Sequence, residues 1–166
     1  MGGAHLPFDR EAVFPQLRRG DYRVTSDEDE KYNCIAHAAG RDDSWRWPAD
    51  PEIEGVHWPR GVELEETLEA FIHAYETEDY VVCQRRDLEV GVEKIAIYID
   101  ADGIPTHAAR QLVDGWWTSK LGGWEDIQHE TLEALEADDD EARQGLGYGK
   151  VAVIMRRPRR QFARRS

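Results

Sequence analysis

A cysteine and a histidine are the side chains of this sequence that best match a nucleophile and its base. Cys34 lies in the run Tyr-Asn-Cys-Ile-Ala-His-Ala-Ala, which predicts a short buried helix with Asn33 as its N-cap. A helix start favours a thiolate, because its unpaired amides and its dipole stabilise negative charge. His107 follows Pro105 at the start of a predicted strand. An imidazole there would take the thiol proton and later protonate a leaving group.

We expect Cys34 and His107 to lie within hydrogen-bond reach in one surface cleft, because each stands at the end of an element. The alternative is structural. Cys34 would then be a small core residue among alanines, and His107 an ordinary residue of a hairpin.

A third group should orient the imidazole, and the sequence leaves the choice open. Asp114-Gly115 predicts a tight hairpin turn. A strict two-residue turn would place His107 on one face with Gln111, Thr118 and Lys120. A bulge would bring Ser119 to that face instead. Three side chains are chemically able to hold the ring: Gln111, Ser119 and Asp126.

Contacts to a substrate are less well marked. The backbone amide of Cys34, with Asn33 nearby, is expected to help bind an oxyanion. Tryptophans provide a candidate rim for the substrate, although most tryptophans of a small domain belong to its core. These tryptophans are Trp45, Trp47 and Trp116.

The sequence contains no signal for a metal or a cofactor. The histidines and cysteines lack Cys-x-x-Cys and His-x-x-x-His spacing. Residues 145–149 are glycine-rich but lack the lysine and the following helix of a phosphate-binding loop. We therefore expect neither a metal nor a cofactor.

Charge is distributed unevenly along the chain. Residues 156–166 hold six arginines and no acid, so residues 1–155 carry 15 basic and 34 acidic groups, a balance of −19. Such a body repels nucleic acid, which leaves the tail as the one segment able to attract it. The apolar runs fall far short of the roughly 20 residues that span a bilayer. We expect a cytoplasmic protein with a protein or peptide as its partner or substrate, and no membrane association.

The elements that position these residues predict an α+β fold. Helices are expected at 32–39, 63–77 and 124–136, with a further short one at 11–17. About five strands should form a mainly antiparallel sheet, because turn signals join them as hairpins. Their expected ranges are 80–84, 94–99, 105–112, 115–120 and 149–155. We expect residues 1–31 to be irregular, 32–157 to form one domain, and 158–166 to be a basic tail. The arginines from 156 onward should be dispensable for folding.

Several strings resemble an uncharacterised bacterial domain family over about residues 32–157. They are Tyr-Asn-Cys-Ile-Ala-His-Ala-Ala-Gly (32–40), Thr-His-Ala-Ala-Arg-Gln (106–111), Trp-Thr-Ser-Lys-Leu-Gly (117–122), Asp-Ile-Gln-His (126–129) and Tyr-Gly (148–149). The resemblance implies a motif set of Cys34, His107, Ser119, Lys120, Asp126 and His129. It carries no settled activity. Position 37 departs from the pattern, with His37 where an aromatic residue is expected.

The element order itself is loosely similar to papain-like and peptidoglycan-hydrolase cysteine enzymes. In that class a nucleophile on an early helix meets a base on a later antiparallel strand. Our leading hypothesis is a cysteine-dependent hydrolase or acyl-transfer enzyme acting on a peptide, amide or ester bond. The alternatives are a non-catalytic acidic interaction module, such as a neutralising or adaptor protein, and a degenerate enzyme fold.

Overall fold

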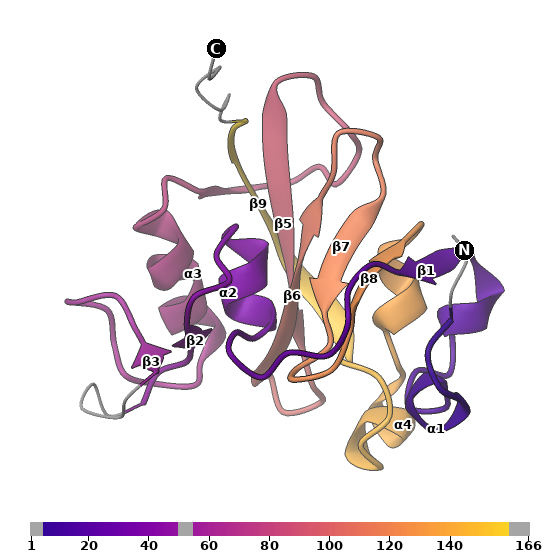
Figure 1. The fold of residues 1–166 in the computed structure, drawn as a ribbon. Coiled ribbons are helices and arrows are strands. Elements are labelled where there is room, and N and C mark those ends of the chain that lie inside the picture. The colour runs from indigo at the N-terminus through magenta and orange to yellow at the C-terminus, as the bar shows by residue number, and fades with distance from the viewer. Residues whose placement is uncertain (1–4, 50–54, 160–166) are drawn as a thin grey trace.

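The computed structural model describes residues 5–49 and 55–159, which form an α+β fold around one antiparallel sheet (Figure 1). The seven strands of this sheet lie in the order β1-β8-β7-β6-β5-β9-β4. They are β1 Tyr22–Val24, β4 Val81–Cys83, β5 Val92–Ile99, β6 Pro105–Gln111, β7 Trp117–Lys120, β8 Asp126–His129 and β9 Lys150–Pro158. A small parallel pair, β2 Trp45–Arg46 and β3 Val56–His57, lies apart from it. The α+β class and the antiparallel pairing are confirmed.

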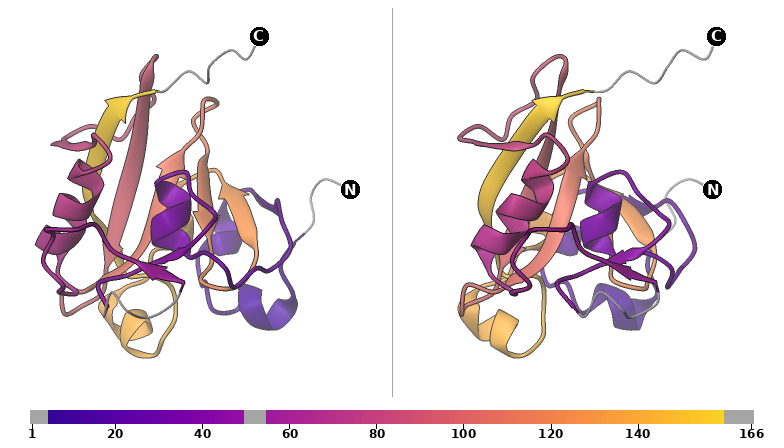
Figure 2. Two further views of the ribbon diagram at one scale, coloured as in Figure 1. Left: turned by 60° about the vertical axis from the view of Figure 1, so that its left-hand side comes forward. Right: turned by 90° about the vertical axis from the view of Figure 1, so that its left-hand side faces the viewer.

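Four α-helices accompany the strands of the described residues. They are α1 Phe8–Glu11, α2 Cys34–Ala38, α3 Leu68–Glu76 and α4 Asp139–Arg143, with short 3-10 helices η1 Leu17–Arg19 and η2 Leu132–Leu135. Helices α2 and α3 lie over the same face of the sheet (Figure 1). Helix α4 stands at one end of the molecule and the end of β9 at the other (Figure 2). None of the helices in the described ranges is long and apolar enough to cross a bilayer.

The longest helix begins later than the sequence pattern predicts. The side chain of Thr67 caps α3 by accepting a hydrogen bond from the amide of Ala70. This cap ends the helix on its N-terminal side, so Leu64 lies outside it and is exposed. The apolar face expected for the helix is nevertheless present, because Phe71 and Tyr75 are fully buried.

The helix expected at 124–136 is wrong. This segment forms strand β8 followed by η2. Strand β8 pairs with β7 in the register Trp117↔His129 and Ser119↔Ile127. The apolar spacing of the segment fits a helix and a strand almost equally well, and the pairing with β7 decides between them.

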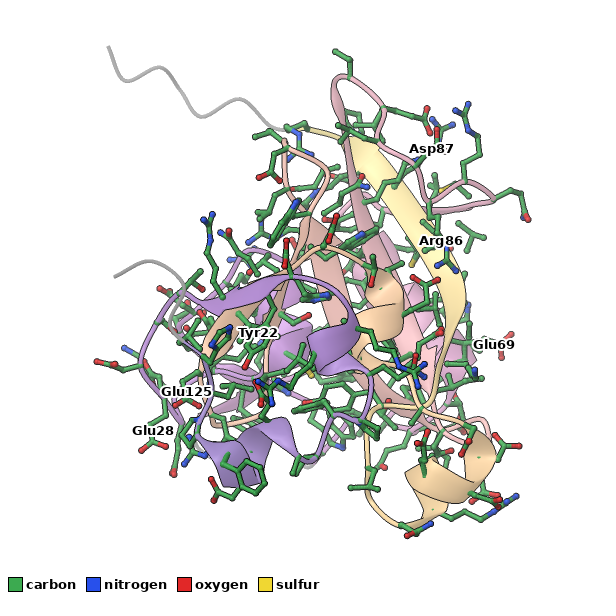
Figure 3. All side chains as sticks on the ribbon, turned by 90° about the vertical axis from the view of Figure 1, so that its right-hand side faces the viewer. Tyr22, Glu28, Glu69, Arg86, Asp87 and Glu125 are labelled. Carbon is green, nitrogen blue, oxygen red and sulfur yellow. The ribbon has the colours of Figure 1, made fainter. Side chains whose placement is uncertain are left out.

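The N-terminal segment, expected to be irregular, belongs to the same core. Strand β1 pairs with β8 at the edge of the sheet, and Leu6, Phe14 and Leu17 are buried. Figure 3 shows Tyr22 of β1 with Glu28 and Glu125 on the same side of the molecule. Arg10 reaches both glutamates at 2.8 Å and so ties α1 to two loops.

The last strand extends into the expected basic tail. Strand β9 runs to Pro158, and Arg157 is buried with its guanidinium bonded to Glu93. The expectation that this arginine follows the last strand is therefore wrong. Residues 160–166 of the expected tail lie outside the described residues.

Two core clusters cover the two faces of the central strands. Successive side chains of a strand point to opposite faces, and β5 shows this clearly. Ala96 and Tyr98 belong to the first cluster, while Ile95 and Ile97 belong to the second, beneath α2 and α3. The side chains that matter below can be assigned to a face by the same alternation.

Candidate active site

Helix α2 begins at Cys34 because Asn33 caps it, as predicted. Oδ1 of Asn33 accepts hydrogen bonds from the amides of Ala36 (3.2 Å) and Arg46 (3.0 Å). Its Nδ2 donates to the carbonyl of Arg46 at 2.7 Å. Both polar atoms of the side chain are thus engaged within the protein, and a contribution of Asn33 to binding an oxyanion or substrate stays a prediction.

The thiol of Cys34 is buried, with 6% of the residue exposed. Burial raises the pKa of this thiol to about 11, although the amides of Ala108, Ile35 and Cys34 itself favour the thiolate. The helix start therefore acts in the predicted direction and is outweighed by desolvation. At neutral pH Cys34 is a neutral thiol.

His107 lies deeper, with no exposed surface. Its ring stacks on Tyr148 at 4.1 Å between centroids and 2° between planes, and meets Tyr98 edge-on at 5.3 Å. Burial lowers the pKa of His107 well below its usual value, and the neighbouring His129 and His37 lower it further. The imidazole is therefore neutral as well.

A hydrogen-bond relay fixes the ring of His107. Its Nε2 lies 2.9 Å from Oγ of Ser119, which lies 2.8 Å from Nε2 of His129. Nδ1 of His129 lies 2.8 Å from the carbonyl of Thr131. Because a carbonyl only accepts, His129 carries its proton on Nδ1 and accepts from Ser119 at Nε2. The hydroxyl must then accept from Nε2–H of His107.

This relay leaves Nδ1 of His107 unprotonated. The atom is buried and has no hydrogen-bond partner among the described residues. A neutral imidazole with one nitrogen held as donor can accept a proton only at the other, and burial makes His107 a weak base at that atom. Burial lowers the pKa of His129 to about 4, so the relay stays uncharged across physiological pH.

The relay crosses a gap in the backbone ladder between β6 and β7. These strands pair at only two positions, Arg110↔Thr118 and Gln111↔Trp117. Toward the start of β6 the bond between His107 and Ser119 takes the place of backbone pairing. Helix α2 packs over both strands at this point.

Cys34 and His107 meet the same stretch of β6 from different sides. The thiol lies beside the amide of Ala108, the residue after His107. Side chains of adjacent strand residues point to opposite faces, and Cys34 and Ala108 share the second core cluster. No hydrogen bond joins the thiol to His107. Both side chains are buried, so the expectation of an open surface cleft is wrong.

The hairpin register differs from a strict two-residue turn. Gln111 faces Trp117, with five residues between them, rather than Thr118. Alternation then places Ser119 on the face of His107, as the bulge alternative predicts, and places Thr118 and Lys120 on the opposite face. Of the three candidates for the third group, Ser119 is the one that contacts the ring.

The other supporting candidates make separate contacts. Nε2 of Gln111 donates to the carbonyl of Arg86 at 3.1 Å, on the loop where Figure 3 labels Arg86. Nζ of Lys120 donates to three backbone carbonyls at 2.6–2.8 Å and lies over the ring of Tyr32. Lys120 therefore holds loops together around the start of α2.

Asp126 belongs to a polar cluster on the α2 face. Its Oδ2 accepts from the hydroxyl of Tyr32 at 2.8 Å and lies 3.9 Å from Nδ1 of His37. Nε2 of His37 lies 2.9 Å from Oγ1 of Thr118. Burial lowers the pKa of His37 to about 4, against the attraction of Asp126. His37, unexpected in the sequence pattern, thus joins α2 to β7 as a neutral polar group.

The candidate tryptophans are dispersed. Trp47 packs edge-on against Phe71 and donates to Glu66, so it covers α3. Trp45 lies half-buried in β2. Trp116 precedes β7 at the opposite end of β6 from His107. The structure does not bring these residues together into a rim.

Sequence reasoning missed the roles of His129 and Tyr148. The alternation Asp-Ile-Gln-His at 126–129 would have placed His129 inward with Ile127, had the segment been recognised as a strand. Tyr148 was marked only by the Tyr-Gly string of the family resemblance, which gave it no role, and its ring reaches His107 from the loop before β9. In the described ranges no group of three His, Cys, Asp or Glu side chains is arranged to hold a metal ion.

Comparison with known proteins gives the family. The search of curated proteins and the search of solved structures each found no significant match. A family model, Domain of unknown function (DUF7689), matches residues 23–156. The match begins within β1, which lies outside the range of the resemblance drawn from sequence strings, and it provides no link to papain-like hydrolases. The chain belongs to the DUF7689 family of domains of unknown function.

Proposed function

We propose that the protein is a cysteine-dependent hydrolase or acyl-transfer enzyme that acts on a peptide, amide or ester bond. One observation carries the proposal. The relay through Ser119 and His129 fixes His107 with a free basic Nδ1, next to the strand residue whose amide contacts the Cys34 thiol. A purely structural histidine gains nothing from an unsatisfied buried nitrogen, which costs stability.

The chemistry uses a neutral pair. The two side chains lie on opposite faces of β6, so the proposal requires the gap between β6 and β7 to open and bring the thiol to the ring. As the sulfur of Cys34 then attacks the substrate carbonyl carbon, the thiol proton passes to Nδ1 of His107. In the first turn of α2 the amide of Ala36 is bound to Asn33, so the proposal assigns the oxyanion to the amides of Cys34 and Ile35. When the oxyanion collapses, the leaving group takes the proton from Nδ1, and the acyl group remains on sulfur as a thioester. Water or another nucleophile then accepts the acyl group with His107 as base.

The positive charge that forms on His107 during attack has a defined neighbour. Its Nε2–H points at Oγ of Ser119, so the ring keeps its orientation while Nδ1 gains and loses a proton. In this proposal Ser119 is the third group that orients the imidazole, and His129 holds Ser119. The likeness to that class still rests on element order and on this local arrangement.

Acylation of Cys34 by an activated ester tests the proposal. The chain Cys83→Ser leaves Cys34 as its one thiol. Incubation with p-nitrophenyl acetate near pH 8 should release p-nitrophenol and add one acetyl group to Cys34, seen by intact-protein and peptide mass spectrometry. His107→Ala should slow acylation by about 10²–10⁴-fold, the usual contribution of a general base.

Two controls separate this reaction from background. The cysteine-free chain Cys34→Ala/Cys83→Ser should show no acetylation, and Glu130→Ala, an exposed change beside the relay, should react like the parent chain. If Cys34 of the folded Cys83→Ser chain is not acetylated, while the same chain unfolded in urea is acetylated readily, the proposal is contradicted. Equal rates with and without His107 would contradict it as well.

A non-catalytic interaction module is the second candidate, favoured by the charge of residues 1–155. One acidic stretch lies at α4, where a hollow is lined by Asp138, Asp139, Asp140, Arg143 and Lys150. An arginine-rich peptide that binds the native chain, and binds less well after Asp139→Asn and Asp140→Asn, would support this candidate if acylation of Cys34 fails.

A further inference from the structure

Three arginines converge on one carboxylate at the end of the sheet away from α4. Arg157 of β9 donates from Nε (3.0 Å) and Nη2 (2.9 Å) to Oε1 of Glu93 on β5. Arg110 of β6 and Arg159, just after β9, both approach the other oxygen, Oε2. Arg110 comes from β6 and the other two from the end of β9, so the arrangement depends on β5 lying between these two strands.

The three guanidinium groups are not equivalent. Arg157 is fully engaged: its side chain is 5% exposed, it stacks over Tyr80, and Nη1 donates to the carbonyl of Glu78. Nη1 of Arg110 lies 3.8 Å from Oε2 of Glu93, and Nη1 of Arg159 lies 3.6 Å from it. Both distances exceed those of a charge-assisted hydrogen bond, about 2.7–2.9 Å.

Arg110 also has a donor without a partner. Its Nε is buried and makes no hydrogen bond within the described residues, although about a fifth of the side chain (21%) reaches the surface. Buried polar groups of native proteins are nearly always paired, so an unpaired guanidinium N–H needs an explanation. A guanidinium presents five donors in a fixed fork that suits planar and tetrahedral oxyanions.

The local charge points the same way. Glu93 supplies one negative charge against three guanidinium groups, and Glu78, whose carbonyl accepts from Arg157, has its carboxylate paired with Arg41 and Arg46. His37 is neutral because burial lowers its pKa, and the positive charge of Arg110 lowers it further. A surplus of positive charge therefore persists here in a chain whose net charge is −13.

We propose that Arg110 and Arg159 form a binding site for an oxyanion, a phosphate or a carboxylate. Arg157 and Glu93 form its floor: Glu93 holds the guanidinium groups together, and Arg157 fixes Glu93. Arg110 and Arg159 are each about one-fifth exposed (21% and 22%), so both are accessible to a ligand. The ligand completes the hydrogen bonds that Glu93 leaves long. This site is independent of Cys34 and of the proposed reaction.

The oxyanion can be a phosphate or the carboxylate of a peptide C-terminus. Titration calorimetry at constant ionic strength distinguishes the two ligands. One titrant is inorganic phosphate, with chloride as the ionic-strength control. The other is a short neutral peptide with a free C-terminal carboxylate, compared with its C-terminal amide. At least one of the two oxyanions should bind, and the amide and chloride should not.

Two single variants test the site, with a matched control. Arg110→Gln and Arg159→Gln should each weaken binding by about tenfold or more, which corresponds to the loss of one charge-assisted contact. Arg143→Gln removes the same charge from exposed α4 and should bind like the native chain. Arg159 lies just after β9, so its substitution should be tolerated by the fold. Arg159→Gln therefore tests the site even if Arg110→Gln does not fold. Absence of binding by both oxyanions up to about 10 mM, where binding is weaker than about 3 kcal/mol, would overturn the proposal. Equal affinities of the native chain and Arg159→Gln would also overturn it.

Discussion

Strand β6 carries two polar sites that differ in burial and in charge. Near its start, His107 is neutral, fully buried and held by hydrogen bonds of 2.8–2.9 Å through Ser119 to His129. Near its end, Arg110 is charged and partly exposed, and approaches Glu93 at 3.8 Å. A buried group without charge can be fixed in one orientation at little desolvation cost. A cluster of charges keeps its donors near water and holds them loosely.

The largest expected change in stability comes from removing the charge of Glu93. Glu93→Gln leaves Arg157 buried beside two further guanidinium groups, with no carboxylate among them. Loss of one partner of a buried ion pair costs about 3–5 kcal/mol. We expect a decrease of that size in the free energy of unfolding measured by urea denaturation.

A matched change at an exposed pair serves as the control. Asp87 and Arg85 pair at 2.6 Å with both side chains more than half exposed, and Figure 3 shows Asp87 at the rim of the molecule. Asp87→Asn should leave the free energy of unfolding nearly unchanged. If Glu93→Gln were as mild as Asp87→Asn, the arginine cluster would not depend on this carboxylate.

The neutral site is tested by removing the centre of its relay. Ser119→Ala leaves Nε2 of His107 and Nε2 of His129 buried without partners. Each unsatisfied buried group costs about 1–3 kcal/mol, so we expect a loss of about 3 kcal/mol. Ser44→Ala, in the loop before β2, is the control and should have almost no effect. A stability of Ser119→Ala equal to that of the native chain would show that the relay does not hold His107.

The pH dependence of stability distinguishes the two sites by sign and range. The folded pKa of His129 is about 4, below the usual value of about 6.5, so the unfolded chain binds the extra proton as pH falls. Stability from this group is complete above pH 6.5 and decreases toward pH 4. The slope is about 1.4 kcal/mol per pH unit for each histidine so buried.

Urea denaturation at pH 7, 6 and 5 measures this slope. His129→Gln should make it shallower by up to one proton, whereas Arg159→Gln, at the same arginine cluster, should leave it unchanged because a guanidinium does not titrate there. A slope of the native chain that persists in full after His129→Gln would contradict the neutral assignment of His129.

The last prediction concerns the reactivity of the thiol, not the stability of the fold. With a pKa of about 11, Cys34 in the Cys83→Ser chain should react with iodoacetamide at pH 7 about 300-fold more slowly than a thiol of pKa about 8.5. The measurement is the rate of alkylation by mass spectrometry, with the urea-unfolded chain as reference. Fast labelling at pH 6 would contradict the raised pKa and reveal an activated thiolate.

Local sequence signals were sufficient for part of this structure. Asn33 caps α2 because its side-chain oxygen can accept a hydrogen bond from a free amide at the start of the helix. The turn at 114–115 joins two antiparallel strands, as predicted. The thiol was placed correctly at a helix start. Its pKa was not, because desolvation depends on what covers α2, and residues from distant parts of the chain do so.

The rest depended on pairings between segments far apart in the sequence. His129 reaches Ser119 because β8 pairs with β7, and the same segment reads equally well as a helix. The arginine cluster requires β5, β6 and β9 to lie side by side, which nothing near Arg110 or Arg157 in sequence reveals. Non-local contacts of this kind override local preference.

The short ladder between β6 and β7 has a mechanical consequence. Two residue pairs join the β1-β8-β7 half of the sheet to the β6-β5-β9-β4 half. Separation of the halves from the start of β6 breaks side-chain bonds first and leaves both ladders whole, so it requires less free energy than global unfolding. We call this boundary between β6 and β7 the seam. Its opening exposes the imidazole of His107 and the thiol of Cys34 together. Amide hydrogen exchange should show the earliest loss of protection along this seam.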